Sequence, residues 1–96
     1  MPTVRIWTGR EAAALRTAMR LSVRAFAEHL GVAVRTVSKW EQLGAATRPH
    51  PDTQAILDTA LDRAPESARI RFQALLAQAP MLAGGWLVAS RNWDYE

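Results

Sequence analysis

The 96-residue chain is 49% hydrophobic and can bury one modest core, so we expect a single domain. Because the chain has no cysteine, it cannot form disulfides, thiolate metal sites or cysteine nucleophiles. It shows no signal peptide and no apolar run as long as the roughly 20 residues that cross a bilayer, so we expect a cytoplasmic protein and no membrane partner. Residues 1–50 carry eight basic and three acidic side chains, a net charge of +5, whereas residues 51–96 carry four basic and six acidic ones, −2, so a polyanion is expected to contact the first half.

The first predicted helix runs from about Gly9 to Arg20. In front of it, Thr8 and Glu11 make the pattern of a capping box, in which the hydroxyl accepts from a free backbone amide and the carboxylate accepts from the amide of Thr8. Four apolar residues then recur at helical spacing, namely Ala12, Leu15, Ala18 and Met19. They predict the face of this helix that enters the core.

Two shorter helices are predicted next, separated by one glycine. Ser22 is a favourable N-cap for the second helix, and Gly31 supplies the left-handed residue that ends it. A third helix follows over residues 34–42, where Val37 and Trp40 lie three apart on the inner face. Two short helices joined by a tight glycine turn, the second with a basic polar face, are typical of a helix-turn-helix, whose second helix enters the DNA major groove.

Two further helices are predicted in the second half of the chain. Residues 43–51 form a loop, because they contain one glycine and two prolines. Asp52 is the expected N-cap of a helix that ends near Ala64. Pro65 suits the first position of a fifth helix, which Pro80 is expected to stop.

The fold class expected from these elements is all-α, with five helices over residues 1–79 and a non-helical tail over residues 80–96. The tail contains Trp86, Trp93 and Tyr95, large aromatic side chains whose exposure to water is unfavourable. They are expected to pack on their own chain or to contact a second subunit, and a ligand pocket or a contact with a partner protein is a further alternative.

The segments "LRTAMRLSVRAFAEHLGV" and "RTVSKWE" resemble the lambda-repressor-like, Xre-type helix-turn-helix family, particularly the amino-terminal domains of actinobacterial regulators of that type. The resemblance covers roughly Trp7–Ala64 and implies an ion pair between Arg16 in the first helix and Glu41 at the end of the third. The family often has glutamate at the position of Ala25 and a hydroxyl cap at that of Ala33, so both helix starts are less fully capped here.

The third helix is expected to contact DNA bases. Its exposed positions, opposite the inner face, are Val34, Arg35, Ser38 and Lys39. Arg35 and Lys39 are predicted to read bases directly, with guanine as the preferred partner because it offers two acceptors in the major groove. The resemblance implies base contacts for Ala33 and Val34 as well, and here these side chains can touch only a thymine methyl group.

Other residues are expected to contact the phosphate backbone. The resemblance places Ser22, Arg24 and Thr36 at phosphate-facing positions, and we add Arg48 in the following loop. Such contacts position a protein on DNA without reading the sequence. For Arg24 and Arg48, an ordinary place on the solvated surface is equally compatible with the sequence.

Two classes of function remain open from the sequence. The first is a sequence-specific, double-stranded DNA-binding transcriptional regulator that acts as a homodimer on an inverted repeat, because one domain of this size contacts only a few base pairs. The second is an antitoxin or adaptor-type interaction module whose aromatic tail binds a partner protein and whose DNA binding is autoregulatory. His29 and His50 are too far apart to predict a metal site, and Asp58 and Asp62 lie on one exposed helix face, so no catalytic residue, metal or cofactor is predicted.

Overall fold

The computed structural model describes the backbone of residues 4 and 6–85, and the side chains of these residues up to Ala77. Its elements are five α-helices and one short 3-10 helix: α1 (Gly9–Met19), α2 (Val23–Leu30), α3 (Val34–Leu43), η1 (Gly44–Ala46), α4 (Pro51–Arg63) and α5 (Glu66–Gly85). No strand occurs within the part of the chain that the structure describes, which confirms the predicted all-α class.

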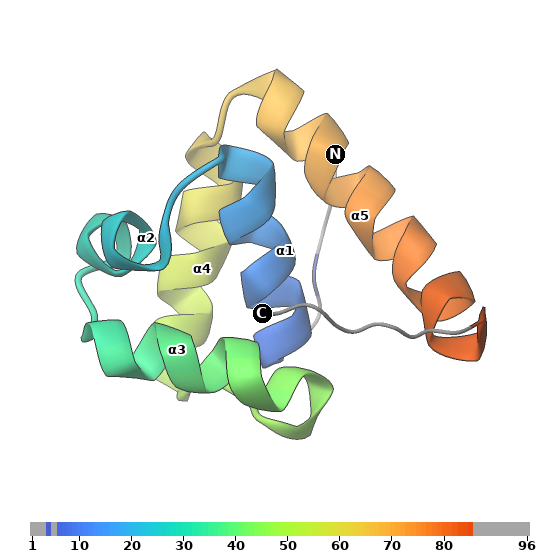
Figure 1. Ribbon diagram of the computed structural model, residues 1–96. Helices are drawn as coiled ribbons and strands as arrows, with labels where there is room; N and C mark the ends of the chain where they lie inside the picture. Colours follow the sequence, from blue (N-terminus) through green and yellow to red (C-terminus); the bar gives the residue numbers. More distant parts are fainter. Residues whose placement is uncertain (1–3, 5, 86–96) are drawn as a thin grey trace.

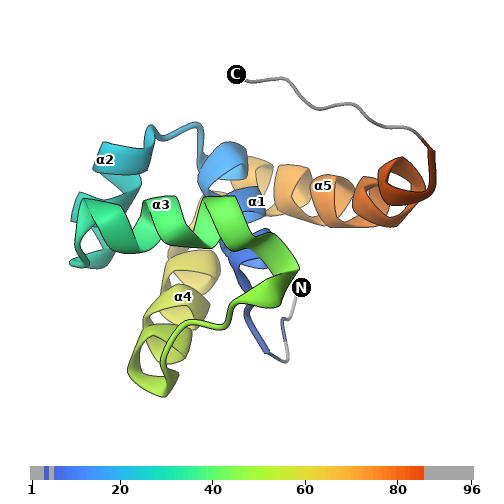
Figure 2. The same cartoon turned by 60° about the horizontal axis from the view of Figure 1, so that its bottom comes forward.

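Helix α1 is the centre of the bundle (Figure 1). It makes its most extensive contacts with α5 and α3, which lie on different sides of it. Helix α2 follows α1 and packs on α3 and α4, and the view in Figure 2 shows α3 running along the outside of the bundle. The core therefore forms around α1, and α3 is left with one free face.

The start of α1 is capped as the sequence predicts. The amide of Thr8 donates to Glu11 Oε1 at 2.9 Å, and the amide of Arg10 donates to Thr8 Oγ1 at 3.2 Å, so the capping box is confirmed. The helix ends at Met19, where Arg20 takes the left-handed conformation with φ 61° and its amide donates to the carbonyls of the last turn. This end lies one residue before the predicted one.

The predicted start of α4 was wrong. The helix begins at Pro51 with His50 in the N-cap position, so Asp52 lies within the first turn instead of capping it. Proline suits the first helical position, because its fixed φ is already helical and an amide hydrogen there would have no helical partner. This backbone preference fixes the start of the helix two residues earlier than an N-cap at Asp52 predicts.

The predicted end of α5 was also wrong, since the helix continues through Pro80 to Gly85. Proline lacks an amide donor and its ring crowds the carbonyl four residues back, which disfavours an interior helical position without excluding it. At the other end, Pro65 precedes the first helical residue, and its carbonyl accepts from the amide of Ala68 at 2.9 Å. The predicted tail contact through Trp86, Trp93 and Tyr95 falls outside the described residues.

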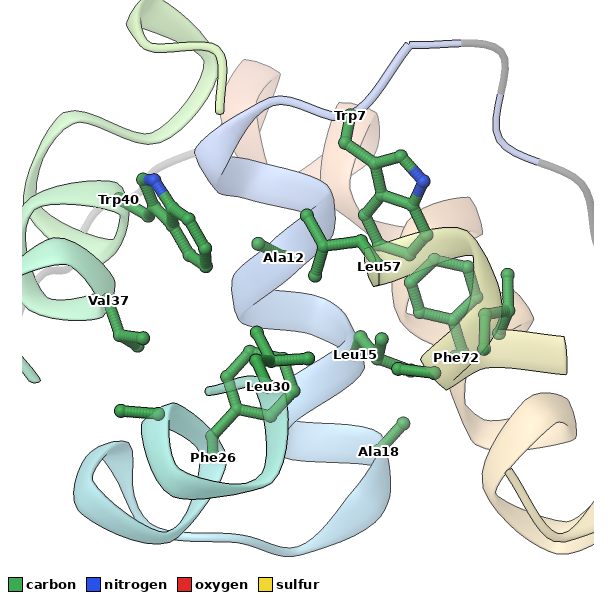
Figure 3. Packing of buried hydrophobic residues seen from close by; sticks show 13 residues of the cluster. Trp7, Ala12, Leu15, Ala18, Phe26, Leu30, Val37, Trp40, Leu57 and Phe72 are labelled. Carbon is green, nitrogen blue, oxygen red and sulfur yellow. The ribbon is translucent and has the colours of Figure 1, made fainter. Parts of the chain in front are cut away.

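The core is a single apolar cluster to which every α-helix contributes (Figure 3). Its largest fully buried side chains are Trp7, Phe26, Phe72, Leu15, Leu57 and Val37. Trp7, which precedes α1, stacks on Phe72 of α5 with ring centroids 5.7 Å apart and ring planes at 30°. Such aromatic pairs stabilise a core beyond the area that they bury, so the segment before α1 is part of the packed fold.

One glutamine side chain joins that segment to α4. The Gln54 carboxamide accepts from the amide of Trp7 at 2.7 Å and donates to the carbonyls of Trp7 at 2.9 Å and Pro49 at 3.0 Å. The indole of Trp7 also donates to Asp58 Oδ1 at 2.7 Å. These hydrogen bonds satisfy the polar groups of a buried tryptophan and hold the chain before α1 and before α4 against the same helix.

The start of α1 approaches the end of α3 closely enough to require glycine. Gly9 is buried, and a Cβ atom built on it lies 2.8 Å from the carbonyl oxygen of Gly44 and 2.9 Å from the carbonyl carbon of Trp40, with the carbonyl oxygen of Trp40 nearer still. The amide of Gly9 donates to the carbonyl of Thr47 at 3.0 Å. Backbone atoms cannot move aside as a flexible side chain can, so this contact admits no side chain.

An ion pair connects the other end of α1 to α3. Arg16 Nε lies 2.6 Å from Glu41 Oε2 and Arg16 Nη2 lies 3.2 Å from Glu41 Oε1, a bidentate geometry. Arg16 Nη1 donates to the carbonyl of Leu21 at 2.9 Å, in the turn between α1 and α2. The two side chains are 24% and 26% exposed, so the pair is half-buried and water screens it only in part.

We expect Gly9→Ala to destabilise the fold by about 1–3 kcal/mol or more, because the added methyl group overlaps backbone atoms of α3. Helix propensity alone predicts the opposite sign, a gain of about 0.5–1 kcal/mol. Urea unfolding followed by circular dichroism measures the difference. The control is Thr17→Ala at an exposed position of the same helix, which should stay within about 0.5 kcal/mol of the unchanged protein. An unaltered midpoint for Gly9→Ala would contradict the close approach.

Glu41→Ala should lower the free energy of unfolding by about 1–3 kcal/mol, between the values for exposed and fully buried ion pairs. The substitution leaves the Arg16 guanidinium half-buried without its carboxylate. Arg10→Ala is the matched control, because it removes the Arg10–Glu11 pair within α1, which joins no second helix, and should cost under about 1 kcal/mol. Equal losses for the two variants would show that the pair between α1 and α3 contributes no more than a local one.

Candidate nucleic-acid interface

A single glycine sets the turn between α2 and α3. Gly31 has φ 78°, and its amide donates to the carbonyls of Ala27 at 2.8 Å and Glu28 at 3.2 Å. A Cβ atom at this position meets nothing within 4 Å, so the left-handed backbone, and not a lack of space, requires glycine here. Ser22 Oγ caps the start of α2 by accepting from the amide of Ala25 at 3.0 Å.

Packing against α2 fixes the angle of α3. Ala27 is fully buried, and its small side chain lets α3 cross close to α2. Val37 and Trp40 are buried on the inner face of α3, beside α1 and α2 (Figure 3). With these two side chains inward, the opposite face of α3 is directed toward solvent.

That outward face carries Arg35, Ser38 and Lys39, all exposed as the sequence predicts. They are spaced three and four residues apart, which puts them on one side of the helix. Two cations and a hydroxyl group on one helix face offer hydrogen-bond donors to a ligand that lies along the helix.

The first turn of α3 differs from the prediction at one position. Val34, expected to be exposed, is half-buried, because it packs against the core cluster together with Val32. Ala33 is exposed in the N-cap position and makes no side-chain cap. The amide of Thr36 donates to the carbonyl of Ala33 at 3.0 Å, whereas the amides of Val34 and Arg35 have no side-chain cap.

A groove of about 320 Å³ lies between α3 and the chain that leads into α4. Its lining is formed by Arg35, Thr36, Lys39, Trp40, Thr47, Arg48, Pro49, His50 and Thr53. This lining contains three cationic side chains and no carboxylate, so the groove is attractive to an anion. The structure thus brings together four of the residues that the sequence singled out, Arg35, Thr36, Lys39 and Arg48.

The sequence did not identify Thr47, His50 and Thr53 as part of this groove. Their place follows from the early start of α4, which turns residues 47–50 toward α3. Proline at the first helical position was the available signal, because it fixes where the preceding loop must end.

The loop that carries Arg48 is held on both sides of that residue. The carbonyl of Thr47 accepts from the amide of Gly9 at 3.0 Å, and the carbonyl of Pro49 accepts from Gln54 Nε2 at 3.0 Å. Pro49 is itself buried, whereas Arg48 is exposed. The guanidinium of Arg48 is therefore presented from a fixed backbone, which lowers the entropy cost of binding a ligand.

The cations of the groove are not neutralised by neighbouring acids. Within the described part of the chain, the two ion pairs are Arg10–Glu11 and Arg16–Glu41. Arg35, Lys39 and Arg48 thus have no carboxylate partner there, and their charge remains available to a polyanion.

Ser22 and Arg24 lie apart from the groove lining, at the start of α2, and both are exposed. Ser22 Oγ acts as an acceptor within the cap, so its hydroxyl hydrogen remains free to be donated. The structure therefore offers a second, separate position for contact with an anion.

Within the described part of the chain, no helix has both the length and the apolar character required to cross a bilayer.

Comparison with known proteins supports this arrangement of the helices. The model of the family described as "Helix-turn-helix domain" matches residues 7–70, about two thirds of the chain. No curated protein and no solved structure matches the chain. The matched residues include α1 to α4 and the glycine turn, and the chain belongs to the helix-turn-helix domain family.

Proposed function

We propose that this protein is a sequence-specific transcriptional regulator of the lambda-repressor-like, Xre type, which places α3 in the major groove of double-stranded DNA. The observation that carries the proposal is the uncompensated positive charge along the outward side of α3. Arg35 and Lys39 on the helix and Arg48 beside it share one groove without a carboxylate. A helix with donors on one face, next to a fixed cationic loop, fits base edges and an adjacent phosphate.

The geometry suggests different roles for the two parts of this surface. Arg35, Ser38 and Lys39 project from α3 itself, so we assign them to base contacts, with guanine as the partner preferred by the two cations. Ala33, exposed in front of the helix, and the exposed part of Val34 are assigned to contact with thymine methyl groups.

The phosphate contacts are assigned to residues that flank α3. Thr36 and Arg48 line the groove beside the helix, and Ser22 and Arg24 lie at the start of α2. Because the two sets are on different elements, we propose that they contact separate positions of the DNA backbone, as is usual when a helix is held across a groove.

We further propose that the protein acts in the cytoplasm as a homodimer on an inverted repeat. A single α3 of 10 residues reaches only a few base pairs, and two-fold pairing of chains doubles the site that is read. The expected boundary between residues 79 and 80 falls inside α5, so we propose residues 1–85 as the DNA-binding domain and residues 86–96 as the arm that contacts the second chain.

Selection of duplexes from a random pool by the full chain should enrich one short sequence motif, arranged as an inverted repeat. On this enriched duplex, Arg35→Ala and Lys39→Ala should each cost about 1–3 kcal/mol of specific binding, because each removes a donor to a base edge. Fluorescence anisotropy measures the affinity, and circular dichroism checks that both variants remain folded. A pool without any enriched motif, or unchanged affinity in both variants, would contradict the proposal.

Arg48→Ala and Arg24→Ala should weaken binding to all duplexes alike and make the slope of log affinity against log salt concentration less steep by about 0.9 for each phosphate that is no longer neutralised. A duplex with a single half-site is used, so that association of two chains does not enter. Arg63→Ala removes the same charge from an exposed position of α4 outside the groove and should leave the slope unchanged. An affinity decrease confined to the enriched sequence would instead assign Arg48 or Arg24 to the bases.

A further inference from the structure

A second groove, of about 480 Å³, lies on another part of the molecule. It is bordered by the end of α1, the end of α2, the outward side of α4 and the link to α5. Its apolar lining includes Met19, Leu30, Ile56 and Ala60. Ile56 is 37% exposed and lies beside the other apolar side chains of the lining, so covering this groove removes apolar area from water.

The charge that lines this groove is positive. Arg63 lies there together with the His29 imidazole and the Thr59 hydroxyl, and no carboxylate is part of the lining. Arg63 takes part in neither of the two ion pairs found among the described residues. A complementary occupant therefore has apolar groups for the floor and acidic groups for the rim.

The chain itself contains a segment with this chemistry. Residues 86–96, "WLVASRNWDYE", combine Trp86, Trp93 and Tyr95 with the acids Asp94 and Glu96. The acids stand next to the aromatic residues at the end of the segment. An apolar ring in the groove would thus carry a carboxylate toward the cationic rim.

The dimensions favour the segment of another copy over that of the same chain. Helix α5 begins directly after Pro65, at the edge of the groove, and its 20 residues extend about 30 Å at 1.5 Å per residue. Figure 1 shows the far end of α5 on the side of the molecule opposite α2. The eight residues from Trp86 to Trp93 span at most about 29 Å when fully extended, so Trp93 of the same chain reaches the edge of the groove only if this whole segment is straight and runs back along α5.

We propose that residues 93–96 of one chain dock in the groove between α2 and α4 of a second copy, with Trp93 on the apolar floor and the acids beside Arg63 and His29. The exchange is reciprocal, so two grooves are filled in a dimer with two-fold symmetry. This inference deepens the homodimer proposed above and rests on it. The proposed contact joins residues 93–96 of one chain to the groove between α2 and α4 of the other, and it leaves the outward face of α3 free.

Cysteine cross-linking of the full chain tests the contact, because the protein has no cysteine of its own. Chains with Thr59→Cys, in the groove, are mixed with chains with Asn92→Cys, next to Trp93, and oxidised mildly without DNA. A disulfide between residue 59 of one chain and residue 92 of the other, found by mass spectrometry, is the expected result. The control replaces Thr59→Cys by Ile70→Cys, which is 58% exposed on α5, and should give little of the product.

The double variant Thr59→Cys/Asn92→Cys separates the alternative occupants. A cross-linked species of dimer mass supports the proposal, whereas a cross-link within one chain assigns the groove to the same chain's segment and overturns it. Equal cross-linking of the Ile70→Cys control, or none at all in a folded protein, overturns it as well. Since the readout needs no DNA, retained binding to the enriched duplex without this cross-link would reject the contact and leave the proposed function intact.

A pair of apolar substitutions gives an independent measurement. Ile56→Asp places a carboxylate on the groove floor and should weaken dimer formation at least tenfold in sedimentation velocity. Ile70→Asp makes the same change at the more exposed position on α5 and should have little effect. Equal weakening by both variants would show that the effect is not specific to the groove and would overturn the proposal.

Discussion

The close approach of α1 to the C-terminal end of α3 is the constraint on which the candidate interface depends. Gly9 lets backbone meet backbone at one end of α1, and Arg16 pairs with Glu41 near the other end. The two contacts come from opposite ends of α1 and meet the same end of α3, so they fix the position of that end, and the buried side chains of Val37 and Trp40 orient the helix against the core. Helix α3 is thus positioned by contacts on its inner side, and the side chains of its outward face are not needed to hold it in place.

The same approach extends to the loop beside α3. The amide of Gly9 holds the carbonyl of Thr47, and Gln54 holds that of Pro49, so the backbone around Arg48 is fixed by residues of α1 and α4. The cations on the helix and on the loop therefore belong to one rigid arrangement, although the sequence separates them. A ligand that binds both parts does not have to order the loop first, which favours affinity through pre-organisation.

Local signals in the sequence predicted much of this fold, and contacts between distant residues account for most of what was missed. The caps at Thr8 and Ser22 and the turn at Gly31 depend on neighbours within a few residues, so their patterns were sufficient. Asp52 failed as a cap because Pro51 competes for the helix start, and Pro80 did not stop α5. The roles of Gly9 and Gln54 depend on partners distant in the sequence, Trp40, Gly44 and Thr47 for Gly9 and Trp7 for Gln54, for which the local sequence holds no pattern.

The packing of Trp7 on Phe72 has a consequence for how the chain folds while it is being synthesised. The contacts that hold α3, made by Gly9 and by the Arg16–Glu41 pair, lie within residues 9–47 and become available early during translation. The ring stack and the hydrogen bond from Arg71 to the carbonyl of Ala18 close only when α5 has left the ribosome. A nascent chain that ends before α5 leaves one face of Trp7 without its aromatic partner. The part of the core around Trp7, which is the first core residue to be synthesised, is therefore the last to be completed.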